Sequence, residues 1–568
     1  MGKGLIPIIL LLFLTACLPP PAQYPYKPAD VLFSEADSLS DKLNQYIDEW
    51  ISGKRPSEIP DSILPVGIDS TKNRHFFLQK FEEIHPDNQW IYRSSGELDF
   101  KGLKKGLYDP HATYLFLSTA LAPFGDELVI EGEYPYCRFF SIQLSAPLDG
   151  KTYCAAGTYG PAETSVADID IPAMQGCENP FAKGGNRMTA NRKYQIKFEM
   201  AYGDSIYANP KAIGEKKHFA SFIQNQGPWW KELGGKGPWN AGNLCIRYYA
   251  PDHNKGDMAG IPLPKAYYVH KNGIKYFIQS DYSGLKKEYN SIEKARKSWS
   301  KEPSQSMGPQ VGWFKSFGLL QSIGAGLLNY HSINFTVYKN YFADIEKGAT
   351  GRGAEVDGRG SMEASSGFNT YSSYLNRMMK VGRKNVFILK GKLPTFPITR
   401  NGRKTLDSAS LRYFSISTYD LQIQKNMHHY ELTSYPLSSV MDDEIILDSA
   451  RNYTIVYSRK IDRPKNAIAE NGVTWVEWGP KSEALILLRW LSVGPDWIMN
   501  PNPHQKTLSW EKTSFLSENY DENLIGKNYK EGLLGDYLPR FYYMSKRDFE
   551  SLDLSKVPYK LPDWRIYR

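Results

Sequence analysis

Two arginine and aspartate pairs recur along the chain and could form either ion pairs or a polar binding site. Asp168 follows Arg138 at the same interval at which Asp442 follows Arg412. An arginine at the start of a core strand is costly to bury unless a nearby carboxylate offers it a bidentate partner. We therefore expect one structural ion pair in each half of the chain, Arg138 with Asp168 and Arg412 with Asp442.

The same four residues also suit a ligand site. With Tyr136, Tyr413 or Trp475 they could form a pocket in which aromatic faces pack on a sugar ring and charges fix its hydroxyl groups. Carboxylates are plentiful enough for a glycoside-hydrolysing pair, but no spacing singles out two of them. The chain lacks His-Glu-x-x-His, Gly-x-Ser-x-Gly and Gly-x-x-x-x-Gly-Lys-Ser/Thr, so no catalytic residue is assigned.

Three further stretches carry polar residues suited to ions, and each has a simpler explanation. The glycine-rich stretch 348–360 could cradle an anion, but it does not join a predicted strand to a helix, and we expect a loop. His428 and His429 are adjacent, so on a strand their rings would point to opposite faces. Residues 252–257 are rich in oxygen ligands without EF-hand spacing, which favours a turn. We expect no metal site and no cofactor.

A repeat places the two arginine and aspartate pairs at equivalent positions of two copies. Arg138-Phe-Phe-Ser-Ile-Gln-Leu144 returns as Arg412-Tyr-Phe-Ser-Ile-Ser-Thr418, and Val166 and Val440 are separated by the same offset as the two arginines. Two more matches follow in the same order: Tyr194-Gln-Ile-Lys-Phe198 with Tyr453-Thr-Ile-Val-Tyr457, and Arg247-Tyr-Tyr-Ala-Pro-Asp252 with Arg489-Trp-Leu-Ser-Val-Gly-Pro-Asp496. We infer a domain duplication.

The two copies differ by an insertion. The interval from Val166 to Tyr194 is longer than the interval from Val440 to Tyr453, so the first copy carries extra residues around Cys177. A function specific to this protein is expected where the copies differ, in this insertion and in the loop at 348–360.

The composition predicts a mainly β fold. Aromatic residues make up 14% of the chain, and short β-branched or aromatic runs alternate with Gly, Pro, Asn and Asp. We expect two tandem jelly-roll-like antiparallel β-sandwiches, over 111–285 and 381–568, the second with a C-terminal tail. A helical lead-in at 33–110 should contain helices over 38–51 and about 74–83. A connector at 286–380 should hold a buried helix at 312–328.

The N-terminus has the features of a lipoprotein signal. Lys3 precedes the apolar run 5–14, which is too short to span a bilayer, and Leu14-Thr-Ala-Cys17 resembles the bacterial lipoprotein box. This resemblance implies removal of residues 1–16 and a diacylglycerol on Cys17, followed by a proline-rich tether to residue 32. Leu18 stands where an aspartate would retain the protein, which by resemblance to Gram-negative sorting rules implies the outer membrane. In a Gram-positive cell the same lipid would anchor the chain in the plasma membrane.

Four cysteines remain for an oxidising compartment. Cys154 and Cys177 are close in sequence and flank a loop-like stretch, so we expect a disulfide between them. Four cysteines allow three pairings, and buried free thiols are the alternative. No Cys-x-x-Cys spacing suggests a metal.

Several motifs together resemble those of uncharacterised bacterial secreted proteins with paired β-sandwich domains of unknown function. They are Gly132-Glu-Tyr-Pro-Tyr-Cys-Arg-Phe-Phe-Ser141, Pro251-Asp252 with Gly260-Ile-Pro-Leu-Pro264, Lys390-Gly-Lys-Leu-Pro-Thr-Phe-Pro397, Asp462-Arg-Pro-Lys-Asn466 and Gly472-Val-Thr-Trp-Val-Glu-Trp-Gly479. The resemblance covers roughly residues 110–500 and implies a tandem jelly-roll-like fold. It supplies no activity and no catalytic residues.

Charge and address narrow the expected partners. A net charge of +8 over 568 residues is mild, and an exported protein has little access to nucleic acid. We expect a membrane contact through the lipid and a role as a ligand- or partner-binding module, for an envelope glycan or another envelope protein. The alternatives are an extracytoplasmic carbohydrate-active hydrolase that uses a carboxylate pair and a purely structural envelope protein.

Overall fold

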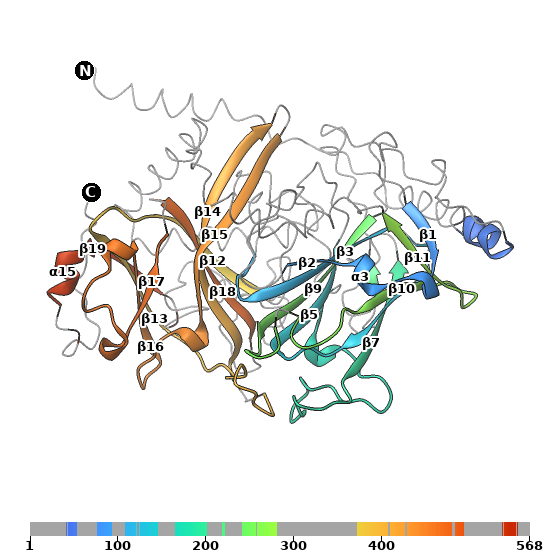
Figure 1. The fold of residues 1–568 in the computed structure, drawn as a ribbon, viewed down its shortest axis with the longest axis horizontal. Coiled ribbons are helices and arrows are strands. Elements are labelled where there is room, and N and C mark those ends of the chain that lie inside the picture. The colour runs from blue at the N-terminus through green and yellow to red at the C-terminus, as the bar shows by residue number, and fades with distance from the viewer. Residues whose placement is uncertain are drawn as a thin grey trace, which may run out of the picture.

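The computed structural model shows a mainly β protein, as the sequence predicts (Figure 1). It describes residues 41, 44–53, 76–93, 108–120, 122–123, 125–145, 165–201, 219–221, 241–256, 258–280, 372–406, 409–426, 429–479, 483–493, 537, 539–552 and 554. Cys17 and its flanking signal and tether, Cys154, His428 and the stretches 312–328 and 348–360 lie outside these ranges, and the predictions made for them stay predictions. Within the described ranges no helix is both long and apolar enough to cross a membrane.

The first copy forms one eleven-stranded β-sheet of order β6-β5-β9-β3-β11-β10-β4-β7-β8, in which β1 (Phe76–Lys80) also pairs with β11 and β2 (Ile91–Arg93) with β3. The pairing of β11 with the end of β3 joins its two halves, β3-β9-β5-β6 and β8-β7-β4-β10-β11, which are the two layers of the first sandwich. The strands are β3 (Ala112–Ala120), β4 (Glu127–Glu133), β5 (Cys137–Ser145), β6 (Ser165–Ala167), β7 (Lys193–Ala201), β8 (Phe219–Ser221), β9 (Ala241–Pro251), β10 (Lys265–Val269) and β11 (Lys275–Ser280).

The second copy repeats this arrangement. Its sheets have the orders β12-β18-β14-β15 and β17-β16-β13-β19, which match β3-β9-β5-β6 and β8-β7-β4-β10 strand for strand. In both copies one edge pair is parallel, β7 with β8 and β16 with β17. The strands are β12 (Ser372–Lys380), β13 (Asn385–Lys392), β14 (Leu411–Asn426), β15 (His429–Met441), β16 (Asn452–Ser458), β17 (Val473–Glu477), β18 (Glu483–Val493) and β19 (Arg540–Ser545).

Two segments outside the predicted sandwich ranges belong to the sheets. The helix expected over about 74–83 is wrong: Phe76–Lys80 is strand β1, which pairs with β11, and a 3-10 turn η2 (Phe81–Glu83) follows. Pairing with β11 overrides the helix-like spacing of its apolar residues. Strand β12 lies at the end of the predicted connector and pairs along most of β18. The helix expected over 38–51 is present at residues 44–51, where Tyr46 and Ile47 are buried.

Alternation along the inner strands gives the molecule a layered architecture. In β5, Phe140 and Ile142 point into the core of the first sandwich, whereas Phe139 belongs to a separate cluster. In β14, Phe414 points into the second core and Tyr413 into that same separate cluster. The layers β3-β9-β5-β6 and β12-β18-β14-β15 therefore pack against each other through the faces that point away from their own cores. The remaining layer of each copy lies on the outside of this pair.

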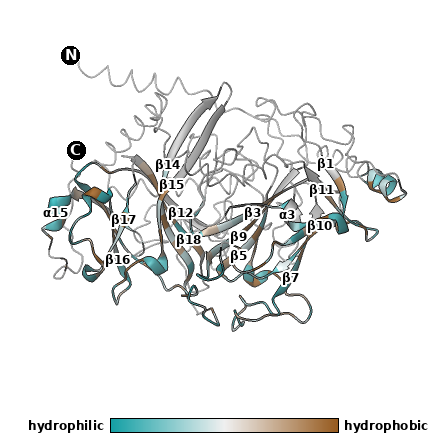
Figure 2. Ribbon diagram, viewed as in Figure 1, coloured by the Kyte–Doolittle hydropathy of each residue, from teal (hydrophilic) through white to brown (hydrophobic). Residues whose placement is uncertain are grey.

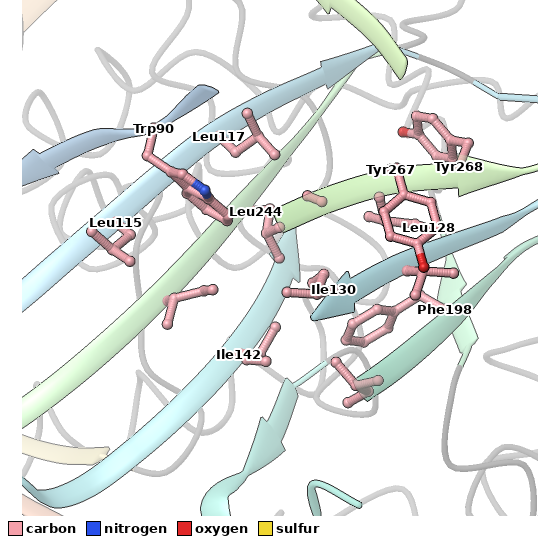
Figure 3. Packing of buried hydrophobic residues seen from close by; sticks show 14 of the residues in the cluster. Trp90, Leu115, Leu117, Leu128, Ile130, Ile142, Phe198, Leu244, Tyr267 and Tyr268 are labelled. Carbon is pink, nitrogen blue, oxygen red and sulfur yellow. The ribbon is translucent and has the colours of Figure 1, made fainter. Parts of the chain in front are cut away.

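The first core is rich in large side chains drawn from both of its layers. Figure 3 shows Leu244 of one layer near Ile130 of the other, with Leu115 and Phe198 farther out on opposite sides of them, and all four are buried. Hydrophilic residues gather instead on connecting turns and on α15 (Lys546–Glu550), which follows β19 (Figure 2). Burial of roughly 150–250 Å² for each aromatic ring makes such cores the main source of stability.

At least one loop of each copy is longer than its counterpart in the other copy. Gly132 and Gly391 are equivalent, because each lies under a tyrosine hydroxyl, of Tyr194 and Tyr453, with which it is paired in register. The interval from this glycine to the repeated arginine is much longer in the second copy than in the first. The second copy thus has its extra residues in the 393–410 loop, whereas the first has its extra residues in the 171–192 loop.

Candidate functional site

The predicted pairing of the repeated arginines is wrong in its partners: each pairs with the aspartate of the other copy. Arg412 Nη2 lies 2.9 Å from Asp168 Oδ1, and Arg138 Nη1 contacts the carboxylate of Asp442. Arg138 Nη2 also lies 2.7 Å from Asp443 Oδ2. The four residues therefore form two reciprocal bridges between the sandwiches, in place of one ion pair inside each.

Each aspartate is also hydrogen-bonded to the backbone of its own copy. Asp168 accepts the backbone N–H of Phe140 at 3.0 Å, and Asp442 accepts that of Phe414 at 2.8 Å. Each carboxylate is thus held by a strand of its own copy. Each aspartate begins a 3-10 turn, η5 (Asp168–Asp170) directly after β6 or η6 (Asp442–Glu444) directly after β15. The arginine from the other copy then bonds to the same carboxylate.

Burial sets the electrostatics of these bridges. Burial raises the pKa of the Asp168 carboxyl to about 6, although Arg412 lowers it. Burial also lowers the pKa of the Arg138 guanidinium, but Asp442 and Asp443 raise it by more, so this arginine stays charged. A buried ion pair is weak evidence for stability by itself, but removing one partner leaves an uncompensated buried charge, and here the two partners of each pair lie in different sandwiches.

A second polar cluster at the interface was missed by sequence reasoning. Asp109, buried just before β3, accepts hydrogen bonds from Tyr413 Oη at 3.0 Å and Ser415 Oγ at 2.6 Å in the second copy. Arg489 Nη1 lies 3.6 Å from the same carboxylate, and Arg489 Nη2 donates to Tyr419 Oη at 2.7 Å. The match of Arg247 with Arg489 in the repeat was a signal for buried arginines here, but Asp109 lies outside the repeat landmarks.

The two insertions meet on one side of the interface. The backbone N–H of Arg187, in the 171–192 loop, donates to Lys404 O in the 393–410 loop at 2.7 Å. Arg187 Nη2 then donates to Asp252 Oδ1 at 2.7 Å, and Leu406 packs against the first core. The 393–410 loop of the second copy is therefore hydrogen-bonded to and packed against the first copy, next to the turn that contains Asp252.

Beside these loops lies a cleft of about 450 Å³ with walls from both copies. The first copy contributes residues 110–111, 250–253 and Gly256, and the second contributes Arg400, residues 436–439 and Met441. Clefts between domains with mostly apolar walls and a few polar groups are typical small-molecule sites.

Three polar atoms of the cleft residues find no hydrogen-bond partner among the described residues: His111 Nε2, Asp252 Oδ2 and Arg400 Nε. His111 Nε2 is 3.9 Å from Glu444 Oε2, beyond hydrogen-bonding distance, and Arg400 Nη1 lies 3.3 Å from Glu444 Oε1. Burial raises the pKa of the Asp252 carboxyl, against the charge of Arg187. Each of these three atoms is almost fully enclosed, and leaving such a group without a hydrogen bond costs roughly 1–3 kcal/mol.

The aromatic residues proposed for the sugar pocket do not line the cleft. Tyr136 is held between Arg192, 3.5 Å from its ring centre, and Lys255 at 4.1 Å. Tyr413 is buried between the copies, and Trp475 Nε1 donates to Ser458 in the second sandwich. The turn expected at residues 252–257 is present at 252–256, and it brings Asp252 into the cleft.

The remaining predicted site residues are only partly among those that the structure describes. Cys177 is a partly buried free thiol, whereas its expected partner Cys154 lies outside the described residues, so the disulfide stays a prediction. His429 pairs with Asn426 at the tip of the β14–β15 hairpin. No group of three metal-ligating side chains occurs in the part of the chain that the structure describes.

Comparisons with known proteins leave the family open. No protein-family model and no curated protein matches this chain. An uncharacterised protein from Burkholderia cenocepacia, known from a crystal structure, aligns with 92% of this chain and 100% of its own, at 9% identity and a TM-score of 0.33. A likeness at this level supports no conclusion about fold or function, so the class of protein rests on its own geometry: a tandem β-sandwich with a cleft between the copies.

Proposed function

We propose that this chain is a lipid-anchored envelope protein in which the cleft between the two sandwiches binds a small polar ligand. The observation that carries the proposal is the cleft of about 450 Å³ between the copies, whose lining includes His111 and Asp252 of the first copy and Arg400 of the second. The reciprocal ion pairs support it, because a rigid interface preorganises the two walls and reduces the entropy lost on binding. The lipoprotein-like box at Cys17 supports the envelope address.

Binding is favoured over glycoside hydrolysis by the lining of the cleft. Hydrolysis by a carboxylate pair requires two acids roughly 5–10 Å apart around the scissile bond. Among the residues that line this cleft Asp252 is the one carboxylic acid, and its Oδ1 is already bonded to Arg187. Another envelope protein is the alternative partner, but a concave site between two domains suits a small molecule better.

The proposal is tested by ligand screening with the full-length chain in detergent. Saturation-transfer difference spectra against a library of small polar molecules should give signals that Arg400→Gln and Asp252→Asn both abolish. Arg383→Ala and Glu470→Gln are matched controls, because both residues are exposed and lie outside the cleft lining. Signals unchanged by either cleft variant, or no signal from the whole library, would remove the cleft from consideration.

A further inference from the structure

We propose that one end of the second sandwich is a contact surface for an anionic phospholipid membrane. The proposal concerns residues outside the cleft lining and does not depend on the cleft. Its apolar component is Ile461, at the centre of the 3-10 turn η7 (Lys460–Asp462), with 86% of its surface exposed. No other large apolar side chain among the described residues is more than 52% exposed.

The strand register brings cationic residues together around this turn. Strand β16 ends at Ser458, shortly before η7, and pairs with β13, which pairs in turn with β19. Asn385 begins β13 opposite Ser545, which ends β19, and beyond them Lys546 N donates to Lys384 O at 2.7 Å. Neighbouring strands lie about 4.8 Å apart, so these three strand ends lie within roughly 10 Å of one another. The cationic residues at or next to them are Arg383, Lys384, Arg459, Lys460, Arg463, Lys465, Lys546 and Arg547.

The acidic residues near this end do not balance these cations. Glu550 lies 3.9 Å from Lys546 and accepts the backbone N–H of Lys465 at 2.9 Å, so one lysine is partly neutralised. Eight cations against five acids leave an excess of three positive charges, over a distance comparable to the Debye length of about 10 Å at 0.1 M salt. The acids counted on η7, η8 (Ala469–Asn471), β17 and α15 are Asp462, Glu470, Glu477, Asp548 and Glu550.

The fold does not require this basic surface, because the first copy lacks it. At the corresponding end of the first copy, Glu127 and Glu199 lie opposite each other in register. Lys546 keeps a cationic counterpart, Lys271, but other cations do not. Counted from the equivalent glycines and tyrosines of the two copies, Lys384, Arg459 and Lys460 correspond to Gly125, Met200 and Ala201. The basic charge is therefore a property of the second copy alone.

The turn holds Ile461 outward on a fixed backbone. Asp462 N donates to Arg459 O at 2.9 Å. Arg463 N donates to Lys460 O at 3.3 Å. The side chain of Asp462 is buried, which anchors the turn on the sandwich, while the preceding side chain projects into solvent. An apolar side chain that is held outward in this way can enter a surface without a large loss of backbone entropy.

A projecting apolar side chain surrounded by cations matches the interface of an anionic bilayer. Each lysine or arginine near such a surface strengthens binding about fivefold, and an apolar side chain adds to this by entering the boundary between headgroups and acyl chains. A protein partner would be expected to cover a larger apolar core, whereas Ile461 is the one exposed large apolar side chain among the described residues of this end. Because salt screens the attraction, the contact orients a chain that the N-terminal lipid already holds.

The experiment measures vesicle flotation of the chain from residue 17 onward with Cys17→Ser, so that no attached lipid contributes. The vesicles are phosphatidylcholine alone and phosphatidylcholine with roughly one-third phosphatidylglycerol. At low salt we expect the anionic vesicles to bind at least about tenfold more tightly than the neutral ones, and physiological salt should remove most of this difference. Lys460→Gln combined with Lys465→Gln should weaken binding about tenfold or more, and Ile461→Ser about fivefold at unchanged charge.

Matched controls change the same residue types in the first copy. Lys183→Gln combined with Lys271→Gln removes the same net charge from exposed positions, and Ile169→Ser removes an isoleucine that is 52% exposed. Each control should change binding by less than about twofold. Equal weakening by both lysine pairs would overturn the proposal in favour of general charge attraction. So would equal binding to neutral vesicles, or no binding to anionic vesicles at low salt. All substituted positions are exposed, and thermal unfolding of each variant should match that of the unsubstituted chain.

Discussion

Arg412 and Asp168 lie 2.9 Å apart although they belong to different copies of the repeat. Their counterparts Arg138 and Asp442 are joined in the same way, with the roles of the copies exchanged. Two such contacts related by exchange of the copies are what a twofold, self-complementary interface produces between identical subunits. The duplicated chain thus folds as an internal dimer, whose two halves hold each other's buried charges.

Removal of Arg138 should destabilise both copies. Arg138→Ala leaves Asp442 buried with its strand hydrogen bond but without its countercharge, so we expect the free energy of unfolding to fall by about 3–5 kcal/mol. Hydrogen exchange should rise in β14 of the second copy, although the substitution is in the first. The exposed Arg383→Ala should change stability by less than about 0.5 kcal/mol. A loss confined to the first copy would show that the bridges do not couple the sandwiches.

Gly391 should tolerate no side chain while Tyr453 keeps its hydroxyl. A Cβ at Gly391 would lie 2.5 Å from Tyr453 Oη, so Gly391→Ala should destabilise the chain by about 1–3 kcal/mol through overpacking. The double variant with Tyr453→Phe should recover part of this loss, because that hydroxyl has no hydrogen-bond partner among the described residues. Denaturant unfolding of the single and double variants measures the recovery, and no recovery would mean that the strain arises elsewhere.

The Asp168 carboxyl should make stability fall as the pH rises through the mildly acidic range. Its pKa is about 6 in the folded chain against an ordinary 3.8, so the folded chain holds this proton more tightly than the unfolded chain does. The resulting stabilisation is complete below about pH 4 and is lost as the pH rises through about 6. The difference in unfolding free energy between wild type and Asp168→Asn should therefore decrease from pH 4 to pH 7. An increase over this interval would contradict the assignment.

Cys17 should carry the membrane anchor. Mass spectrometry of the mature N-terminal peptide should find residue 17 at the N-terminus with a diacylglycerol mass, and Cys17→Ser should shift the chain from the membrane to the soluble fraction. An unmodified Cys17 would rule out the lipoprotein assignment and leave the cleft proposal untouched.

The repeat allowed the fold class and the buried charges to be predicted, because strand periodicity and paired landmarks are local properties of sequence. The partners of those charges were not predictable from spacing: Asp168 is nearer to Arg138 along the chain, but Arg412 reaches it because the outer faces of the inner sheets meet. Strand β1 was mistaken for a helix since its short apolar run suits both, and only pairing with β11 decides between them.

The sequence indicated a region near the cleft, the insertion around Cys177, but not the residues that line the cleft. Specific function was expected where the copies differ, and this stays a prediction; the insertion around Cys177 does place Arg187 next to Asp252, which lines the cleft. Arg400 gave no signal of its own, because its loop becomes part of the cleft only once it packs on the other copy. Asp252 appeared as an ordinary turn residue, and its burial depends on contacts with residues distant in sequence, such as Arg187.

The unequal loops also determine how many ligands one chain should hold. Strands β4 and β5 of the first copy are joined by residues 134–136 alone, whereas β13 and β14 of the second are joined by the 393–410 loop that supplies Arg400. The two sandwiches are therefore not equivalent at the cleft, because the short 134–136 connection of the first copy has no residue that corresponds to Arg400. Despite its duplicated sequence, this protein should bind with a stoichiometry of one ligand per chain.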